Sequence, residues 1–424
     1  MTGLAAGYSS QAVIYEAAET PGGICSSYYV RPDETERLYT MPSDGEVYRF
    51  EIGGGHWIFG RDCAVLHFIR RLTPLRSYHR RSAVYFPRRD LYVPYPIQNH
   101  LSHLDTEIAV RALTEMTSTS TTSYGTMAEW LQVNFGWTLC EIFFHPFHEL
   151  YTSGLWKQIA PQDSYKSPVN PILAIRGALD NAPPVGYNMT FVYPADDLST
   201  FARRMASYVN VHYGKRVVQV DIKRKEVKFA DGKTARYEHL ISTLPLNKMM
   251  EITGLHVDAE IDPYTSVLVI NIGAIKGPRC PEDHWLYIPE SKAGFHRVGF
   301  YSNVDASFLP ASMRKKNDQV SIYVEKAYPG GHKPAEDEIQ LVCRQVIKEL
   351  QEWGFIDRVE VVDPTWVDVA YTWSWPGSRW RQEALSVSEE HDIYQVGRYG
   401  RWLFQGIADS IRDGFVVGSA FKGM

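Results

Sequence analysis

The order of apolar and polar positions along the 424-residue chain alternates between strand-like and helix-like segments. Short apolar runs at Ala12–Tyr15 and Val267–Ile275 predict strands, whereas apolar residues three or four apart over 337–353 predict an amphipathic helix. Apolar and polar residues also alternate on either side of Asp231-Gly232, which predicts a hairpin. The mixture of both periods predicts an α/β protein.

A second hairpin is predicted around Arg88-Arg89-Asp90, because apolar runs end in prolines on both sides of it. The segment that follows has helical spacing over 103–115 and 127–151, with a polar Thr/Ser run at 117–123 between these stretches. We therefore expect a mainly helical region to be inserted after the hairpin.

Composition narrows the class of protein. The hydrophobic content of 44% and charged content of 22% are those of an ordinary globular protein, and the net charge of -5 argues against nucleic acid as the main partner. The five cysteines show no CxxC spacing, so neither a disulfide framework nor a zinc site is predicted, and a reducing cytoplasm is the expected location. No apolar run reaches the roughly 18 residues of a membrane span.

Two histidine pairs have the spacing of metal ligands. They are His100 with His103 and His145 with His148. Because neither pair has a third ligand at a diagnostic distance, we predict no metal site.

Glycines and one acid at the start of the chain suggest a nucleotide site. Gly3 stands at the head of a predicted helix, Glu16 ends the first strand, and Pro21-Gly22-Gly23 follows it. A dinucleotide-binding βαβ unit needs glycines for close backbone approach, a helix N-terminus at the phosphates and an acid for the ribose hydroxyls. The first strand and first two glycines of such a unit are absent.

The end of the chain carries a comparable signal. A glycine-flanked turn, Gly397-Arg398-Tyr399-Gly400, precedes a helix that starts near Gly406-Ile407. The N-H groups of that helix start can face an anion. A Gly53-Gly54-Gly55 run precedes His56, and we expect this run to let the loop move and the imidazole to titrate near neutrality.

In this order, the segments resemble the FAD-binding segments of the superfamily of amine oxidases, protoporphyrinogen oxidases and UDP-galactopyranose mutases. The resemblance implies that FAD is the cofactor and that Glu16 holds its adenosine ribose. It places Val217 at the adenine and His56 against the flavin, where it is a candidate catalytic residue. The other cofactor contacts that it implies are Gly3, Gly22, Gly23, Gly55, Gly397, Arg398, Gly406 and Ile407.

Several segments are closest to the UDP-galactopyranose mutases, notably Val93–Asn99 and the run 285–303. The resemblance assigns Arg297 to an anionic group of the substrate and leaves Tyr371 as a remaining substrate tyrosine. The chain departs from the mutase pattern elsewhere. Lys166 stands in a stretch without arginine, and Val304 and Phe404 replace tyrosines. A nucleotide-sugar substrate is therefore in doubt.

The resemblance implies a discontinuous, Rossmann-like FAD-binding domain made of residues 1–75, 190–262 and 390–424. It also implies a hairpin and helical region over 76–189 and a mixed-sheet, substrate-binding domain over 263–389.

The leading functional hypothesis is an FAD-dependent oxidoreductase acting on a polar small molecule, a carbohydrate or nucleotide sugar, with no nucleic-acid partner. The alternatives are a mutase-like isomerase that uses reduced FAD and a cofactor-free binding relative. Because the pyrophosphate turn lacks its first glycines, we expect the chain as it stands to bind FAD weakly.

Overall fold

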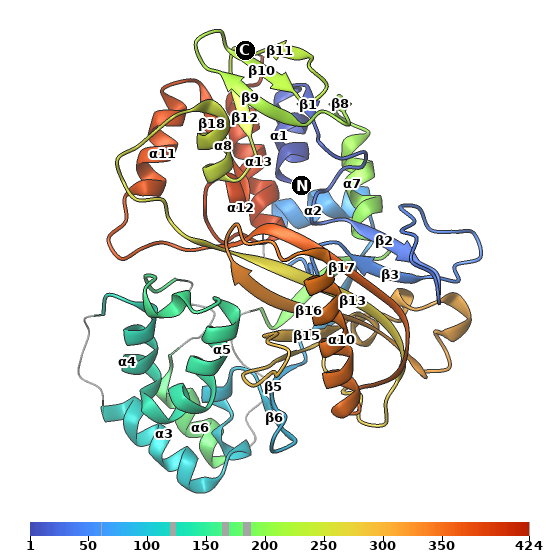
Figure 1. The fold of residues 1–424 in the computed structure, drawn as a ribbon, viewed down its shortest axis with the longest axis vertical. Coiled ribbons are helices and arrows are strands. Elements are labelled where there is room, and N and C mark those ends of the chain that lie inside the picture. Colours follow the sequence, from blue (N-terminus) through green and yellow to red (C-terminus); the bar gives the residue numbers. More distant parts are fainter. Residues whose placement is uncertain (61, 119–123, 163–168, 181–187, 424) are drawn as a thin grey trace.

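The computed structural model describes residues 1–60, 62–118, 124–162, 169–180 and 188–423 (Figure 1). Lys166 and most of the Thr/Ser run, residues 119–123, lie outside the described residues.

A seven-stranded mixed sheet forms the centre of the fold (Figure 1). Its neighbouring strands are antiparallel except for the parallel pair β14 and β5. In spatial order the strands are β17 (Ile356–Thr372), β13 (Tyr264–Lys276), β16 (Gln319–Pro329), β15 (Arg297–Phe300), β14 (Trp285–Tyr287), β5 (Ser82–Phe86) and β6 (Leu91–Pro94). The α/β class predicted from the sequence is confirmed, and the hairpin predicted around Arg88-Arg89-Asp90 forms one edge of this sheet.

Both faces of the sheet are covered, as the middle of β13 shows. Leu268 and Ile270 pack in the core that includes residues of α10 (Glu336–Glu352), whereas Val267 and Val269 pack in the core on the opposite face. Alternate strand residues point to opposite faces, so an almost unbroken apolar run is what a doubly covered strand requires. The second of these cores extends toward the cavity described below.

At the opposite end of the molecule from the helical region, four short strands form two separate parallel pairs. β1 (Ile14–Tyr15) pairs with β8 (Val211–His212), and β12 (Leu240–Ser242) pairs with β18 (Ile393–Gln395). Segments far apart in the sequence thus lie side by side, in the arrangement expected of a discontinuous domain; the domain boundaries themselves stay a prediction.

Two helices pack closely at this end, α1 (Thr2–Ser10) and α13 (Ile407–Ala420). A Cβ atom on Gly414 would lie 2.4 Å from the carbonyl oxygen of Thr2, and one on Gly418 would lie 2.3 Å from that of Ala6. Only glycine fits at such an approach. The contact fixes the first half of α1 against the second half of α13.

The hairpin predicted at Asp231-Gly232 is the second turn of a three-stranded antiparallel sheet. Its strands are β9 (Val217–Asp221), β10 (Glu226–Phe229) and β11 (Thr234–Arg236). The second arm of this hairpin, β11, is only three residues long. Two further antiparallel pairs are β2 (Ser27–Val30) with β3 (Tyr48–Glu51) and β4 (Leu75–His79) with β7 (Thr190–Pro194).

The helical region lies at the lower left of Figure 1 and has its own aromatic core. Its helices are α3 (Thr106–Ser118), α4 (Met127–Leu139), α5 (His145–Tyr151) and α6 (Pro171–Leu179). Thr126 and Glu129 form a capping box at the start of α4, and Gly136 interrupts that helix with a φ of 73°. The remaining helices of the fold are α2 (Cys63–Leu72), α7 (Leu198–Ala206), α8 (Leu246–Thr253), α9 (Tyr301–Val304), α11 (Trp380–Glu389) and α12 (Gly397–Gly400).

Candidate functional site

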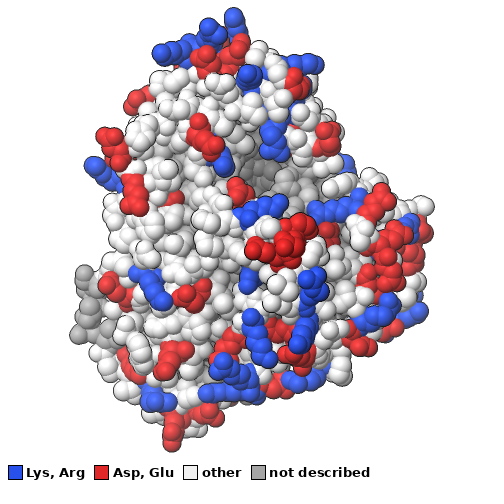
Figure 2. All heavy atoms as spheres, viewed as in Figure 1, with Lys and Arg blue, Asp and Glu red and all other residues white. Residues whose placement is uncertain are grey.

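A cavity of about 640 Å³ runs from the start of α1 to the helical region. The space-filling view shows the surface hollowed in its upper half, with acidic and basic side chains both near the opening (Figure 2). Most of the residues that the sequence singles out line this one cavity. They are Gly3, Glu16, Gly22, Gly23, Gly55, His56, Arg297, Tyr371, Gly397, Arg398, Gly406 and Ile407.

Val217 is the exception. It lies on β9, where it pairs with Phe229, and is outside the cavity wall; Val211 of β8 lines the cavity instead. The backbone contact with an adenine that the resemblance implied for Val217 therefore has no counterpart in the wall of this cavity.

The Pro21-Gly22-Gly23 segment forms a tight loop against the cavity. Gly22 and Gly23 have φ values of 112° and 60°, a region in which side chains other than glycine are strained. Ser26 donates to the carbonyl oxygen of Pro21 and closes the loop. A Cβ on Gly23 would meet nothing within 4 Å, so the backbone there borders open space into which a ligand can approach.

Two helix starts face the same cavity. Thr2 and Gly3 at the start of α1 line it, as do Gly406 and Ile407 at the start of α13. N-H groups in the first turn of a helix have no partner within the helix and favour negative charge. The arrangement can hold anionic groups at two separate places.

Glu16 follows β1 directly and lines the cavity between these features. Its carboxylate accepts a hydrogen bond of 2.9 Å from the backbone N-H of Ala18. The position at a strand end, beside the glycine loop, is the one that ribose hydroxyls require of an acid.

His56 is half-buried in the wall of the cavity. Its Nδ1 donates to the carbonyl oxygen of Gly54. Burial lowers the pKa of His56 to about 4, so the expectation that it titrates near neutrality is wrong for the described conformation. A neutral imidazole can still donate or accept a proton at a hydrogen bond.

The glycine run before His56 has a packing role. A Cβ on Gly55 would lie 2.3 Å from the hydroxyl oxygen of Tyr323, and one on Gly54 would lie 3.0 Å from a carboxylate oxygen of Glu325. The loop passes so close to β16 that larger residues do not fit. Movement of this loop stays a prediction.

Arg297 is ion-paired inside the cavity wall. It contacts both carboxylate oxygens of Glu325, which stands directly opposite on the neighbouring strand. The Tyr371 hydroxyl accepts from Arg297 at 3.2 Å and donates to Glu325 at 3.3 Å. Burial raises the pKa of Glu325, but the charge and hydrogen bonds of Arg297 and the contact with His296 together outweigh it and hold that pKa at about 2.

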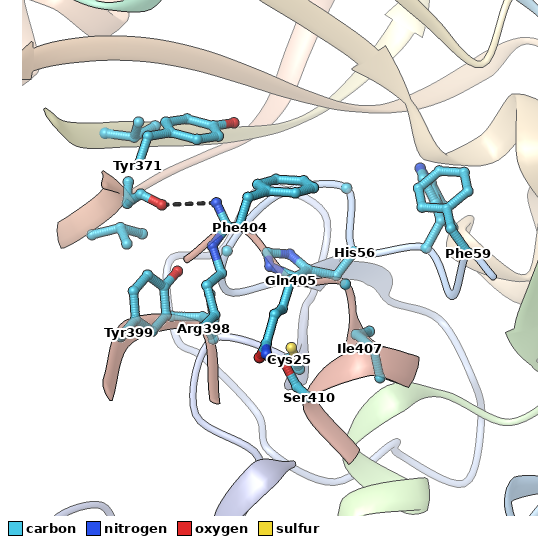
Figure 3. Close-up of a pocket in the computed structure, with 18 of the residues that line it drawn as sticks. Cys25, His56, Phe59, Tyr371, Arg398, Tyr399, Phe404, Gln405, Ile407 and Ser410 are labelled. Atoms are coloured by element: carbon cyan, nitrogen blue, oxygen red, sulfur yellow. Dashed lines mark hydrogen bonds between the residues drawn. The ribbon is translucent and has the colours of Figure 1, made fainter. Parts of the chain in front are cut away.

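Arg398 belongs to the closing turn that the sequence predicts. Its guanidinium donates to the carbonyl oxygen of Ala370 at 2.9 Å, the dashed contact in Figure 3, and lies 4.5 Å from the centre of the Phe404 ring. The Gly397 N-H donates to Asp413, which also pairs with Arg401. These contacts fix the turn against the cavity.

Aromatic rings line the end of the cavity toward the helical region. We call this surface the aromatic wall; its members are Tyr95, Trp130, Phe143, Phe144, Phe147, Tyr151, Tyr287 and Trp373. Phe147 stacks on Tyr151, and Tyr151 lies edge-on to Tyr371. The sequence showed many aromatic residues but not which of them share one surface.

Glu325 is the main site residue that sequence reasoning missed. The available signal was an acid directly after the mostly apolar run Val320–Val324. Its partner could not be identified, because the register between β15 and β16 is a property of the fold.

The histidine pairs form no metal centre within the described ranges, where no group of three potential ligands occurs. His148 donates from Nδ1 to the carbonyl oxygen of Phe144, and burial lowers its pKa to about 4. No disulfide joins the five cysteines. In the part of the chain that the structure describes, no helix combines the length and the apolar character that crossing a membrane demands.

The sequence and the fold can be compared with those of known proteins. No protein-family model matches the sequence. Reduced UDP-galactopyranose mutase superposes with a TM-score of 0.80 at 21% identity, covering 98% of this chain and 90% of that one. The chain therefore shares its fold with this mutase and, at lower TM-scores, with putrescine oxidase and cyclohexylamine oxidase.

Other solved structures share the fold at lower TM-scores. Cyclohexylamine oxidase from Brevibacterium oxydans IH-35A has a TM-score of 0.58 at 13% identity, over 99% of this chain and 96% of that chain. A fatty acid isomerase from P. acnes has a TM-score of 0.55 at 13% identity, with the same coverage. At these identities the likeness establishes the fold, and the chemistry has to be argued from the site.

Proposed function

We propose that this protein is a flavoenzyme that binds FAD in the described cavity. The observation that carries the proposal is the convergence of the Gly22-Gly23 loop, Glu16 and the starts of α1 and α13 on one cavity. The open space beside Gly23 leaves room for a ligand against the backbone. The donor set also fits the cofactor, which has a ribose diol, a pyrophosphate and a flavin edge that becomes anionic on reduction.

Each group of residues has a place in this proposal. Glu16 would accept the ribose hydroxyls, and Gly22, Gly23 and the start of α1 would lie along the pyrophosphate. Gly406 and Ile407 would face the N1/O2 edge of the flavin, with Gly55 and His56 beside the ring. Bound FAD would supply reversible redox chemistry at C4a and N5.

The substrate would then occupy the part of the cavity between His56, Tyr371 and the aromatic wall. Rings with polar tips stack on sugar faces and hydrogen-bond to hydroxyl groups, which supports a carbohydrate substrate. The leading hypothesis is that the enzyme oxidises such a substrate. The likeness to the mutase supports, as the alternative, isomerisation of a sugar by reduced FAD without net redox change.

Flavin binding is tested by the visible absorbance of the purified protein and by titration with FAD. Because this chain is expected to bind FAD weakly, we expect the flavin spectrum to become red-shifted and structured, and tryptophan fluorescence to be quenched, as FAD is added toward saturation. Unchanged spectra at FAD concentrations of about 0.1 mM would instead support a cofactor-free binding relative.

Product analysis separates the two kinds of chemistry. An oxidoreductase consumes one equivalent of electron acceptor per product, whereas a mutase turns over only after its flavin has been reduced and leaves the acceptor unchanged. Incubating the FAD-loaded protein with candidate sugars under air and under dithionite distinguishes these outcomes.

A further inference from the structure

We propose that Glu325 determines substrate specificity by neutralising Arg297, so that the substrate beside the flavin is an uncharged sugar ring and not a nucleotide diphosphate. This inference rests on the proposed function, because it assigns the substrate of the same cavity.

The ion pair leaves Arg297 little capacity to hold an anion. Arg297 and Glu325 face each other across β15 and β16, and the guanidinium contacts both carboxylate oxygens. Binding of a phosphate group gains most from a guanidinium whose fork is open and whose charge is uncompensated. Here Glu325 engages one nitrogen of that fork, Nη2, and compensates the charge of the guanidinium.

The pair is also held in place. The side chain of Glu325 is 3% exposed, and the Gly54 backbone covers it so closely that a Cβ there would lie 3.0 Å from its Oε1. Tyr371 bridges both partners from the neighbouring part of the sheet. An incoming anion would have to displace a buried carboxylate, whose release without a partner is costly.

The other charges of the cavity wall do not replace Arg297. Among the described residues that line the cavity, the basic side chains are Arg80, Arg297 and Arg398 and the acidic ones are Glu16, Glu325 and Asp409. The numbers are equal, and Arg80 and Arg398 already donate to the carbonyl oxygens of Tyr95 and Ala370. A second diphosphate, beside that of FAD, would find no matching excess of positive charge.

The cavity does offer neutral contacts. Arg297 Nε and Trp285 Nε1 are buried donors that have no hydrogen-bond partner in the described part of the chain. Both residues line the cavity, near the Tyr287 ring of the aromatic wall. Unpaired donors beside aromatic rings suit the hydroxyl oxygens and the apolar face of an uncharged sugar.

The test compares two probes on the FAD-loaded protein by calorimetry: UDP, and uncharged 4-nitrophenyl β-D-galactopyranoside. We expect the galactoside to bind and UDP to show no binding at about 1 mM. UDP binding with a Kd below about 0.1 mM would overturn the proposal. So would equal binding of 4-nitrophenol and its galactoside, because the sugar would then contribute nothing.

A variant tests the role of Glu325 directly. Glu325→Gln keeps the shape of the side chain but leaves the charge of Arg297 uncompensated, and we expect its UDP affinity to rise at least about tenfold above wild type. Glu360→Gln is the matched control, since Glu360 is a buried carboxylate paired with Arg358 away from the cavity. A folded Glu325→Gln variant with no gain in UDP affinity would refute the role.

The wild-type protein and its flavin absorbance provide two independent controls. If Glu325→Gln does not fold, the two probes on wild-type protein still decide the substrate class. Flavin absorbance is recorded first, so a protein that binds no FAD refutes the proposed function separately from the probe results.

Discussion

His56 Nδ1 lies 3.0 Å from the carbonyl oxygen of Gly54, two residues earlier in the chain. His332 makes the same contact with Gly330, also at 3.0 Å, but on the exposed surface. The two histidines therefore share a local geometry and differ in burial, which makes them a matched pair for measuring what burial does to the site.

We expect His56→Gln to reduce the acid sensitivity of the fold. The pKa of His56 is lowered to about 4 in the folded protein, so its stabilising contribution is present above the ordinary value of 6.5 and is lost as the pH falls toward 4. Free energies of unfolding from urea titrations between pH 4 and 7 should fall less steeply in His56→Gln.

His332→Gln is the control and should follow the wild-type profile. Some acid sensitivity will remain in His56→Gln, because burial also lowers the pKa values of His100, His148 and His284 to about 4. Identical profiles for His56→Gln and wild type would show that the His56 ring is solvated in solution.

Glu51 is expected to make the folded protein less stable at alkaline pH, whereas His56 makes it less stable at acid pH. Glu51 is fully buried, and burial raises its pKa from 4.5 to about 8, although Tyr193, Arg49 and Ser27 favour the ionised form. Its contribution is complete below about pH 4.5 and is lost as the pH rises through 8. Glu51→Gln should remove this alkaline loss of stability, whereas Glu352→Gln on the exposed face of α10 should leave it unchanged.

Gly23 and Gly232 allow the cofactor site to be tested apart from backbone strain. Both have positive φ values, 60° and 80°, and a Cβ on either would meet nothing within 4 Å, but only Gly23 lines the cavity. Alanine at each should cost about 1 kcal/mol of stability. Only Gly23→Ala should also weaken FAD binding, by about tenfold or more, as measured by fluorescence titration. Equal FAD affinity in both variants would place the cofactor elsewhere.

Glu16→Ala should weaken FAD binding by about 1 to 3 kcal/mol, the cost of losing a hydrogen bond to a charged group. Glu19→Ala, an exposed acid in the same loop, is the control for the change in local charge. If the two variants bind FAD equally well, Glu16 is an ordinary strand end.

Arg297→Met should destabilise the fold by about 3 to 5 kcal/mol, because it leaves the Glu325 carboxylate buried without its partner. The double variant Arg297→Met/Glu325→Gln should recover part of that loss, since it removes both charges. Thermal unfolding of the FAD-free proteins measures both effects. An unaltered melting temperature for Arg297→Met would mean that the pair is open to solvent.

The residues that could be predicted from the sequence are those whose chemistry is local. Gly22, Gly23 and Gly397 stand out because a close backbone approach requires glycine, and Glu16 because it directly follows a strand. Glu325 could not be paired with Arg297 in advance, since their contact depends on the register of strands 28 residues apart. Phe147 and Trp373 meet on one wall only after a helix and a sheet have packed together.

The same limit applies to the fold. The strand β13 and the helix α10 follow from periodicity, whereas the partner of a short strand, such as β8 for β1, is set by the tertiary fold. Val217 was placed at the adenine by resemblance alone, and no feature of its own sequence neighbourhood supports that position.

The parallel pairs β1–β8 and β12–β18 also constrain the order in which the protein can be made. Ile14 pairs with Val211, and Leu240 pairs with Ile393. Neither pair of strands can form until the long stretch of chain between its partners has been synthesised. Contacts so distant in sequence slow folding, and chains emerge from the ribosome N-terminus first. The helix start at Gly406-Ile407 is then the last part of the cavity to leave the ribosome. A ligand that contacts this helix start can therefore reach its complete site only after residues 406–410 have been synthesised.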